Sequence, residues 1–255
     1  MSSQLCCCLQ ARHAFRMRSW ISVLFTFAFT ALLVVVGASA HAQFGAPSPG
    51  TVIHDPSALK PPAGARVAIV EFADLECPAC ARYNRLFKEA AAKYKIPWVH
   101  HDFLIPGHVW STDAAVNVRW FNTKSKALGD EYRDQVFASQ TSIYNLDELR
   151  QFTEKFAQSH GIALPFAIDP QGKLAAEVKA DNDLGLRTGI TSTPTVFIVT
   201  ANSKGAPYRE VLLPFYQLYS VIDQAFADTA SAKPAPVKPP VKKPVAPPAK
   251  TPASN

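Results

Sequence analysis

Between residues 65 and 228, short apolar runs alternate with segments in which apolar side chains recur every three or four positions. The run from Val67 to Phe72 is apolar and rich in β-branched residues, which predicts a buried strand. Helical spacing then predicts a helix that begins at Cys77-Pro78 and ends at about Tyr94. Residues 96–104 read as a second strand. The first part of this region therefore has the order strand, helix, strand.

The second part of the region begins with a long block of helical patterns, from Ser111 to about Gly185. One helix in this block is expected to start at Asn145, because asparagine is a favoured N-cap residue before an apolar repeat. A strand at 195–199, an edge strand at 206–212 and a last helix at 216–226 follow. Strands that alternate with helices predict a fold of the α/β class.

Residues 1–43 have the order of a secretory signal peptide. Arginines precede an uncharged apolar stretch at 20–40, and small residues at 38–42 offer cleavage sites. This predicts export to the periplasm or the extracellular space. The alternative is an uncleaved segment that anchors the protein, because about 20 apolar residues can cross a bilayer. Residues 44–64 are expected to form an irregular lead-in to the domain at 65–228.

Residues 229–255 hold eight prolines, five lysines and no aromatic residue, which predicts a disordered tail. Such a tail is either a solvated spacer or a weak contact with an anionic envelope surface, at about 1 kcal/mol per lysine. The net charge of +6 comes from the two ends of the chain, residues 1–43 and residues 229–255. The residues between them hold 18 basic and 20 acidic side chains. This charge balance argues against a nucleic-acid-binding domain of the usual basic kind.

The candidate chemistry lies in Cys77-Pro78-Ala79-Cys80, the only cysteines of the chain after the leader. A C-x-x-C between a buried strand and a helix indicates a redox pair. The start of a helix favours a thiolate at Cys77, and proline suits the first turn of a helix. Cys80, one turn later, can then attack a mixed disulfide formed at Cys77.

The other chemistries of paired cysteines do not fit the sequence, so no metal or cofactor is expected. Zinc requires four ligands, and no second C-x-x-C or spaced histidine pair is present. His100 and His101 would supply one ligand at most, because neighbours on a strand point to opposite faces. Ala81 stands where the haem-attachment motif C-x-x-C-H requires histidine.

Two further positions are candidates for a role at this pair. Glu71 interrupts the apolar strand six residues before Cys77. It could relay a proton to or from Cys80, or it could lie at a sheet edge or in a structural ion pair. Pro194 opens a β-branched strand. A proline at such a position can follow a cis peptide bond, although only about 5–6% of X-Pro bonds are cis.

Taken together, these motifs resemble the DsbA-like branch of the thioredoxin superfamily over residues 65–228. The resemblance rests on Glu71-Phe72, on the C-P-x-C motif and on Thr193-Pro194-Thr195. It implies a thioredoxin-like fold with a helical domain inserted at about 106–188. It also implies a cis bond before Pro194 and a Thr193 backbone that pairs with the substrate chain.

The function implied by the resemblance is that of an exported thiol–disulfide oxidoreductase. Among the activities of such proteins, the first expectation is a dithiol oxidase. Its substrates would be thiols of secreted or periplasmic proteins, and a membrane redox partner would recycle it. A reductase or isomerase for a dedicated client and a non-catalytic envelope-tethered binding protein are the alternatives.

Two departures from the oxidases of this branch bear on redox strength. Those oxidases have histidine at the position of Ala79, where it helps to stabilise the thiolate. Asp74 and Glu76 add negative charge before Cys77, which opposes the helix effect unless both side chains point into solvent. The sequence therefore predicts a Cys77 pKa and a redox potential between those of thioredoxin and DsbA.

Overall fold

The computed structural model describes residues 50–230 of the chain. The expected signal peptide, the first residues of the lead-in and residues 231–255 of the expected tail lie outside this range. Within residues 50–230, no helix is both long enough and apolar enough to span a bilayer.

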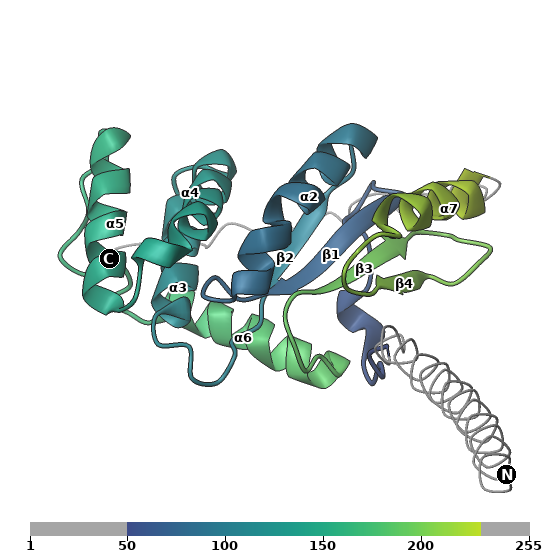
Figure 1. Ribbon diagram of the computed structural model, residues 1–255, viewed down its shortest axis with the longest axis horizontal. Coiled ribbons are helices and arrows are strands. Elements are labelled where there is room, and N and C mark those ends of the chain that lie inside the picture. Colours follow the sequence, from purple (N-terminus) through teal and green to yellow (C-terminus); the bar gives the residue numbers. More distant parts are fainter. Residues whose placement is uncertain (1–49, 231–255) are drawn as a thin grey trace, which may run out of the picture. The chain divides into compact units, whose positions relative to one another are not determined.

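A four-stranded mixed sheet forms the centre of the described domain (Figure 1). The strand order is β2-β1-β3-β4, with β1 parallel to β2 and antiparallel to β3, and β4 antiparallel to β3. β1 therefore has a neighbour on both sides, whereas β2 and β4 lie at the edges. The strands are β1 (Val67–Ala73), β2 (Trp98–Asp102), β3 (Thr195–Thr200) and β4 (Tyr208–Val211).

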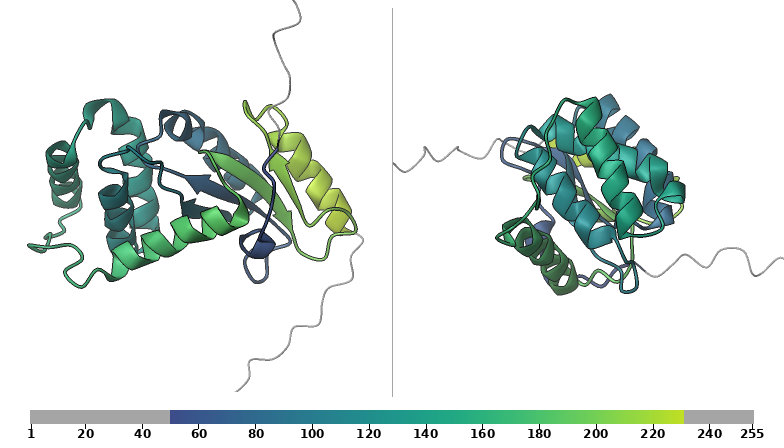
Figure 2. Two further views of the ribbon diagram at one scale, coloured as in Figure 1. Left: turned by 90° about the horizontal axis from the view of Figure 1, so that it is seen from below. Right: turned by 90° about the vertical axis from the view of Figure 1, so that its left-hand side faces the viewer.

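Helices cover both faces of the sheet, and four of them are inserted between β2 and β3 (Figures 1 and 2). α2 and α7 share one face, where their apolar side chains pack with those of β1 and β3. The inserted helices α3 to α6 agree with the expected helical domain. The helical segments are η1 (Pro56–Ala58), α2 (Pro78–Tyr94), α3 (Ser111–Asn122), α4 (Lys126–Ser139), η2 (Gln140–Ser142), α5 (Leu146–Ser159), α6 (Lys173–Thr188) and α7 (Leu218–Ala230).

The central strand β1 is buried along its whole length, as the apolar run predicts. Side chains alternate between the two faces of a strand. Val67 and Ile69 pack with α2 and α7, and Phe72 belongs to the apolar cluster of the opposite face. The same alternation places Glu71 on the face that α2 covers, below the first turn of that helix.

The structure corrects two of the predicted boundaries. The second strand is shorter than expected and begins at Trp98, directly after Pro97. α7 runs to Ala230, so the tail cannot begin at residue 229 as predicted. Thr229 is only 3% exposed, and its hydroxyl accepts a hydrogen bond from Arg66 Nη2 at 3.0 Å. Asn145 is the N-cap of α5, as predicted, and accepts from the Glu148 N–H.

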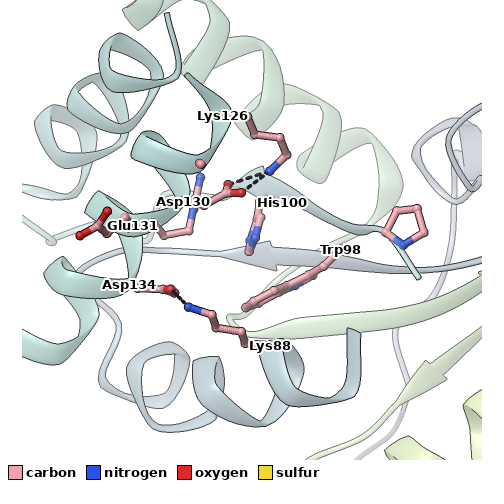
Figure 3. A pocket seen from close by; sticks show the side chains of 10 residues that line it. Lys88, Trp98, His100, Lys126, Asp130, Glu131 and Asp134 are labelled. Atoms are coloured by element: carbon pink, nitrogen blue, oxygen red, sulfur yellow. Dashed lines mark hydrogen bonds and ion pairs between the residues drawn. The ribbon is translucent and has the colours of Figure 1, made fainter. Parts of the chain in front are cut away.

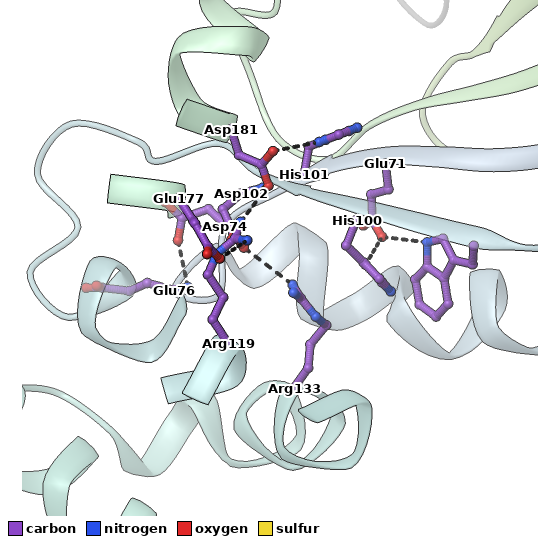
Figure 4. A network of polar contacts seen from close by, with 11 residues as sticks. Glu71, Asp74, Glu76, His100, His101, Asp102, Arg119, Arg133, Glu177 and Asp181 are labelled. Carbon is purple, nitrogen blue, oxygen red and sulfur yellow. Dashed lines mark hydrogen bonds and ion pairs between the residues drawn. The ribbon is translucent and has the colours of Figure 1, made fainter. Parts of the chain in front are cut away.

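A cluster of charged side chains connects the inserted helices to the end of β2 (Figure 4). Arg119 of α3 donates from Nη2 to Asp102 Oδ2 at 2.7 Å and to Asp181 Oδ2 of α6 at 2.6 Å. Arg133 of α4 places Nη1 3.7 Å from Asp102 Oδ1. Arg119 and its two carboxylates are largely buried. The cluster therefore joins the sheet edge to three helices of the insertion.

Substitution of Arg119 by methionine should destabilise the protein by about 3 kcal/mol, because it removes the closest cationic partner of two largely buried carboxylates. Arg150→Met is the matched control, because Arg150 pairs with Glu154 on an exposed helix surface. That change should cost less than about 1 kcal/mol. Urea unfolding measures both values, and equal costs for the two variants would contradict the role of the cluster.

Candidate active site

The two cysteines lie at the first turn of α2, and both thiols are free. Cys77 is the N-cap residue of α2 and its carbonyl accepts the Ala81 N–H at 3.2 Å. Pro78 occupies the first helical position, where no N–H partner is needed. Cys77 is 8% exposed and Cys80 is fully buried. Cys77 is thus the more accessible of the two cysteines.

The environment separates the acidities of the two thiols. The pKa of Cys77 is lowered to about 5, mainly by a hydrogen bond from the Cys80 thiol. Burial acts in the opposite direction, and the backbone N–H groups of Ala79 and Cys80 lower the pKa further. Burial raises the pKa of Cys80 far above its usual range. At neutral pH, Cys77 is therefore a thiolate and Cys80 a thiol.

The loop before β3 faces Cys77. The peptide bond between Thr193 and Pro194 is cis, as the resemblance implies. In the thiol state, Cys77 Sγ donates to the Thr193 carbonyl oxygen at 3.5 Å. The structure therefore brings residues that are 116 positions apart in the chain into contact at the reactive sulfur.

Glu71 is 1% exposed and lies on the central strand, so the sheet-edge interpretation is wrong. Its Oε2 accepts from Trp98 Nε1 at 2.9 Å and lies 3.4 Å from His100 Nδ1 (Figure 4). Burial raises the pKa of Glu71 to about 7, against the lowering effects of Arg133 and of the Trp98 hydrogen bond. The charge of Glu71 in turn raises the pKa of Cys80. Glu71 can therefore gain and lose a proton near neutral pH beside the buried thiol.

One interpretation of the sequence is that Asp74 and Glu76 point into solvent. In the structure, both side chains instead bind backbone N–H groups. Asp74 is buried and accepts from the N–H groups of Glu76 at 2.7 Å and of Ile105 at 2.8 Å. Glu76 accepts from the N–H groups of Trp110 at 2.7 Å and Ser111 at 3.1 Å, at the start of α3. Both carboxylates thus hold neighbouring loops in place.

Sequence reasoning missed Gln140. Its Nε2 donates to the carbonyl oxygens of Leu75 at 2.6 Å and Cys77 at 3.0 Å. Gln140 comes from η2, in the inserted domain, and the pattern of the sequence contains no signal that points to it. The insertion therefore holds the backbone on which the reactive cysteine lies.

Sequence reasoning also missed the two partners of Glu71. Trp98 and His100 line a hollow of about 580 Å³ between α2, β2 and α4 (Figure 3). His101 points to the other face, where its Nδ1 lies 2.9 Å from Asp181, as strand alternation predicts. Among residues 50–230, no group of three histidine, cysteine or acidic side chains is placed to hold a metal ion.

The comparisons with known proteins agree with this geometry. The family model described as Thioredoxin matches residues 63–210. The chain belongs to the thioredoxin family. Membership of this family, together with the intact pair Cys77 and Cys80, makes the protein a thiol–disulfide oxidoreductase. A comparison with curated proteins finds no match.

Solved structures show that the fold is that of a DsbA-like protein. α-DsbA1 of Wolbachia pipientis is 18% identical, with a TM-score of 0.54 over 70% of this chain and 96% of the other. ScsC of Proteus mirabilis, in a transitional conformation, is 14% identical, with a TM-score of 0.52 over 88% and 99%. A periplasmic thioredoxin-like protein of Salmonella enterica serovar Typhimurium is 16% identical, with a TM-score of 0.50 over 65% and 87%.

Replacement of the buried cysteine should trap reaction intermediates. In Cys80→Ala, a mixed disulfide formed at Cys77 has no internal thiol to resolve it, so adducts should accumulate at Cys77. Non-reducing gels followed by mass spectrometry of the adducts measure this. Cys77→Ala is the matched control and should trap little, because Cys80 is fully buried. Stronger trapping by Cys77→Ala would reverse the assignment.

Relative to the oxidised form, the reduced protein should gain stability as the pH rises from about 5, the folded pKa of Cys77, to about 8.5, the value for an unfolded chain. In this window the folded state binds fewer protons than the unfolded state, so deprotonation favours folding. The gain is lost as the pH falls through about 5. Thermal melting of both redox forms measures the effect. The oxidised form has no Cys77 thiol to titrate and should lack this contribution.

Proposed function

We propose that the protein is an exported dithiol oxidase of secreted or periplasmic proteins. A client thiolate attacks the oxidised pair at Cys77 and forms a mixed disulfide, with Cys80 as the leaving sulfur. The second client thiol, after losing its proton, then displaces Cys77. The client leaves with a disulfide, and the two electrons remain on the reduced pair.

The observation that carries this proposal is the lowered pKa of Cys77, about 5. This value lies between about 7 for thioredoxin and about 3.5 for DsbA, as the sequence predicts. A thiolate that the protein stabilises favours the reduced pair, and this makes the disulfide a stronger oxidant. The structure therefore supports a poise more oxidising than that of thioredoxin.

The surface beside Cys77 offers room for a client. A hollow of about 310 Å³ next to Pro78 is lined in part by Trp110, Gln140 and Tyr144. The Thr193 backbone lies on the reactive sulfur, where an extended client segment can pair with it. These features support a peptide substrate with Thr193 and Pro194 as its binding residues.

Export and recycling are parts of the same proposal. Residues 1–43 support export by their signal-peptide pattern, with anchoring by an uncleaved segment as the alternative. A reduced pair needs an electron acceptor, and for an exported protein we assign this role to a membrane redox partner. The lysines of the tail support a weak contact with an anionic envelope surface.

A second candidate function is reduction or isomerisation of disulfides in a dedicated client. Ala79 favours it, because alanine provides no charge or donor to the thiolate. The two functions differ in redox potential, which runs from about −270 mV for thioredoxin to about −120 mV for DsbA. A non-catalytic binding protein is the least favoured, because both thiols are intact and free.

Equilibration of the purified protein with glutathione measures its potential, and oxidation of a reduced, unfolded protein measures its activity. A dithiol oxidase should lie well above about −270 mV and should introduce disulfides catalytically. A potential near that of thioredoxin, with reduction of insulin as the main activity, would contradict the dithiol oxidase and support the reductase as the function of the protein.

The substitution Ala79→His should lower the pKa of Cys77 and raise the redox potential by tens of millivolts, on the order of 1–3 kcal/mol. A histidine there adds a positive charge or a hydrogen-bond donor beside the thiolate. Glutathione equilibration and thiolate absorbance against pH measure the two quantities. Ala79→Gln is the control for side-chain size, and should move both less than histidine does. No change in either quantity with histidine would show that this position does not set the potential.

A further inference from the structure

His100 is a buried ionisable group that the reaction at the two cysteines does not use directly. The parallel register of β1 and β2 pairs it with Glu71, so the two side chains lie side by side on one face of the sheet. Its side chain is 12% exposed. Nδ1 is buried, has no hydrogen-bond partner and lies 3.4 Å from Glu71 Oε2. An unpartnered buried nitrogen is rare in folded proteins and calls for an explanation.

The other side of the His100 ring borders the hollow between α2 and α4 (Figure 3). At about 580 Å³ the hollow is far larger than the roughly 15 Å³ that one water molecule requires. Three cationic and three acidic side chains contribute to its wall: Lys88, Lys126, Arg133, Asp130, Glu131 and Asp134. Four of these form two ion pairs: Lys88 of α2 pairs with Asp134 of α4 across the hollow, and Lys126 pairs with Asp130 along α4. This balance selects neither an anion nor a cation, so water is the expected occupant.

The buried pair Cys80 and Glu71 needs a route by which protons reach solvent. Cys80 is fully buried and Glu71 is 1% exposed. When Cys80 attacks a mixed disulfide at Cys77, its thiol proton has to leave. If Glu71 accepts that proton, Glu71 has to release it to another group before it can accept the next one. Of its two polar neighbours on β2, Trp98 can only donate a hydrogen bond, whereas an imidazole can both accept and donate.

The charges around His100 keep its ring neutral. Burial lowers its pKa well below 6.5, and the positive charges of Arg133 and Lys126 on α4, together with the neighbouring imidazole of His101 on β2, act in the same direction. From α2, Lys88 is paired with Asp134 across the hollow, and the two cysteines face Glu71. A neutral imidazole has one protonated nitrogen and one acceptor nitrogen. It can therefore take a proton on one side and release another on the opposite side.

We propose that His100 passes protons between Glu71 and water in the hollow between α2 and α4. In one direction, Nδ1 takes the proton from Glu71 Oε2 while Nε2 releases its proton to water. The opposite half-reaction, in which Cys80 leaves as a thiolate and needs a proton, reverses both transfers. One full cycle restores the original tautomer, and protons balance without any further reactant. His100 acts through Glu71 and is a positioning residue, not a catalytic one.

This inference rests on the proposed function in one respect, namely that Glu71 exchanges a proton with Cys80. The experiment is a stopped-flow measurement on the full chain, with oxidised glutathione as the probe. It separates attack by Cys77 from resolution by Cys80. His100→Ala should slow the resolution step by about tenfold or more and leave the attack by Cys77 unchanged. Glu71→Gln should slow the same step.

Chemical rescue distinguishes a proton relay from a structural role. In His100→Ala, the space of the ring opens into the hollow, so added imidazole should restore the resolution rate in proportion to its concentration. Imidazole should not accelerate Glu71→Gln. Lys88→Met is the matched control, because it changes the wall of the same hollow and is not a partner of Glu71. It should keep the wild-type rate and its pH profile.

Each outcome decides the inference. A slow His100→Ala variant that imidazole restores supports it. A wild-type rate, or a slow rate that imidazole leaves unchanged, overturns it. If His100→Ala does not fold, His100→Gln decides, because an amide cannot relay a proton, and a wild-type rate and pH profile in that variant overturn the inference. If Glu71→Gln also resolves normally, the proton role of Glu71 fails together with the inference. The exchange at Cys77 and Cys80, and the potential that defines the oxidase, are measured separately.

Discussion

The hydrogen bond from the Cys80 thiol to the Cys77 sulfur is the interaction on which the chemistry of this protein depends. It is the largest cause of the lowered pKa of Cys77. It exists only while Cys80 keeps its proton, and burial ensures this by raising the pKa of Cys80. The same burial creates the difficulty that a proton has to leave the interior in one half of the cycle and enter it in the other.

The surrounding fold serves to hold these two sulfurs in one geometry. Phe87 and Ala90 are buried on α2 and fix the helix against the sheet. Gln140 holds the carbonyl of Cys77 from the inserted domain, and the Thr193 carbonyl meets the sulfur from the loop before β3. Three segments far apart in the chain therefore position the Cys77 sulfur. The Arg119 cluster contributes indirectly, because it attaches the insertion to the end of β2.

Charge in the interior is arranged differently at the two ends of β2. At its carboxyl end, Asp102 and Asp181 are neutralised by Arg119, as buried ion pairs need to be. At its amino end, Glu71 has Trp98 and His100 as neighbours and no direct ion pair with Lys or Arg. Burial then raises the pKa of Glu71 to about 7, the range in which a proton carrier works. The first arrangement favours stability, and the second favours exchange of a proton.

The sequence by itself determined the order of elements and the place of the cysteine pair at the start of a helix. These features depend on local rules: β-branched apolar runs form strands, helical spacing forms helices, and a C-x-x-C at a helix start favours a thiolate. Asn145 as a helix cap and Cys77 as the more accessible of the two cysteines follow from such rules as well. The end of α7 was misplaced because Thr229 is held by Arg66, which is 163 residues away.

Only the tertiary structure decided the surroundings of the pair. It showed that Glu71 lies on a central strand, that Asp74 and Glu76 bind backbone N–H groups, and that Gln140 reaches the active-site loop. Each of these contacts joins residues separated by about 30 positions or more. The pairing of Glu71 with His100 likewise depends on the register of two strands. Local sequence patterns carry no record of register or of long-range contacts, because both result from how the whole chain packs.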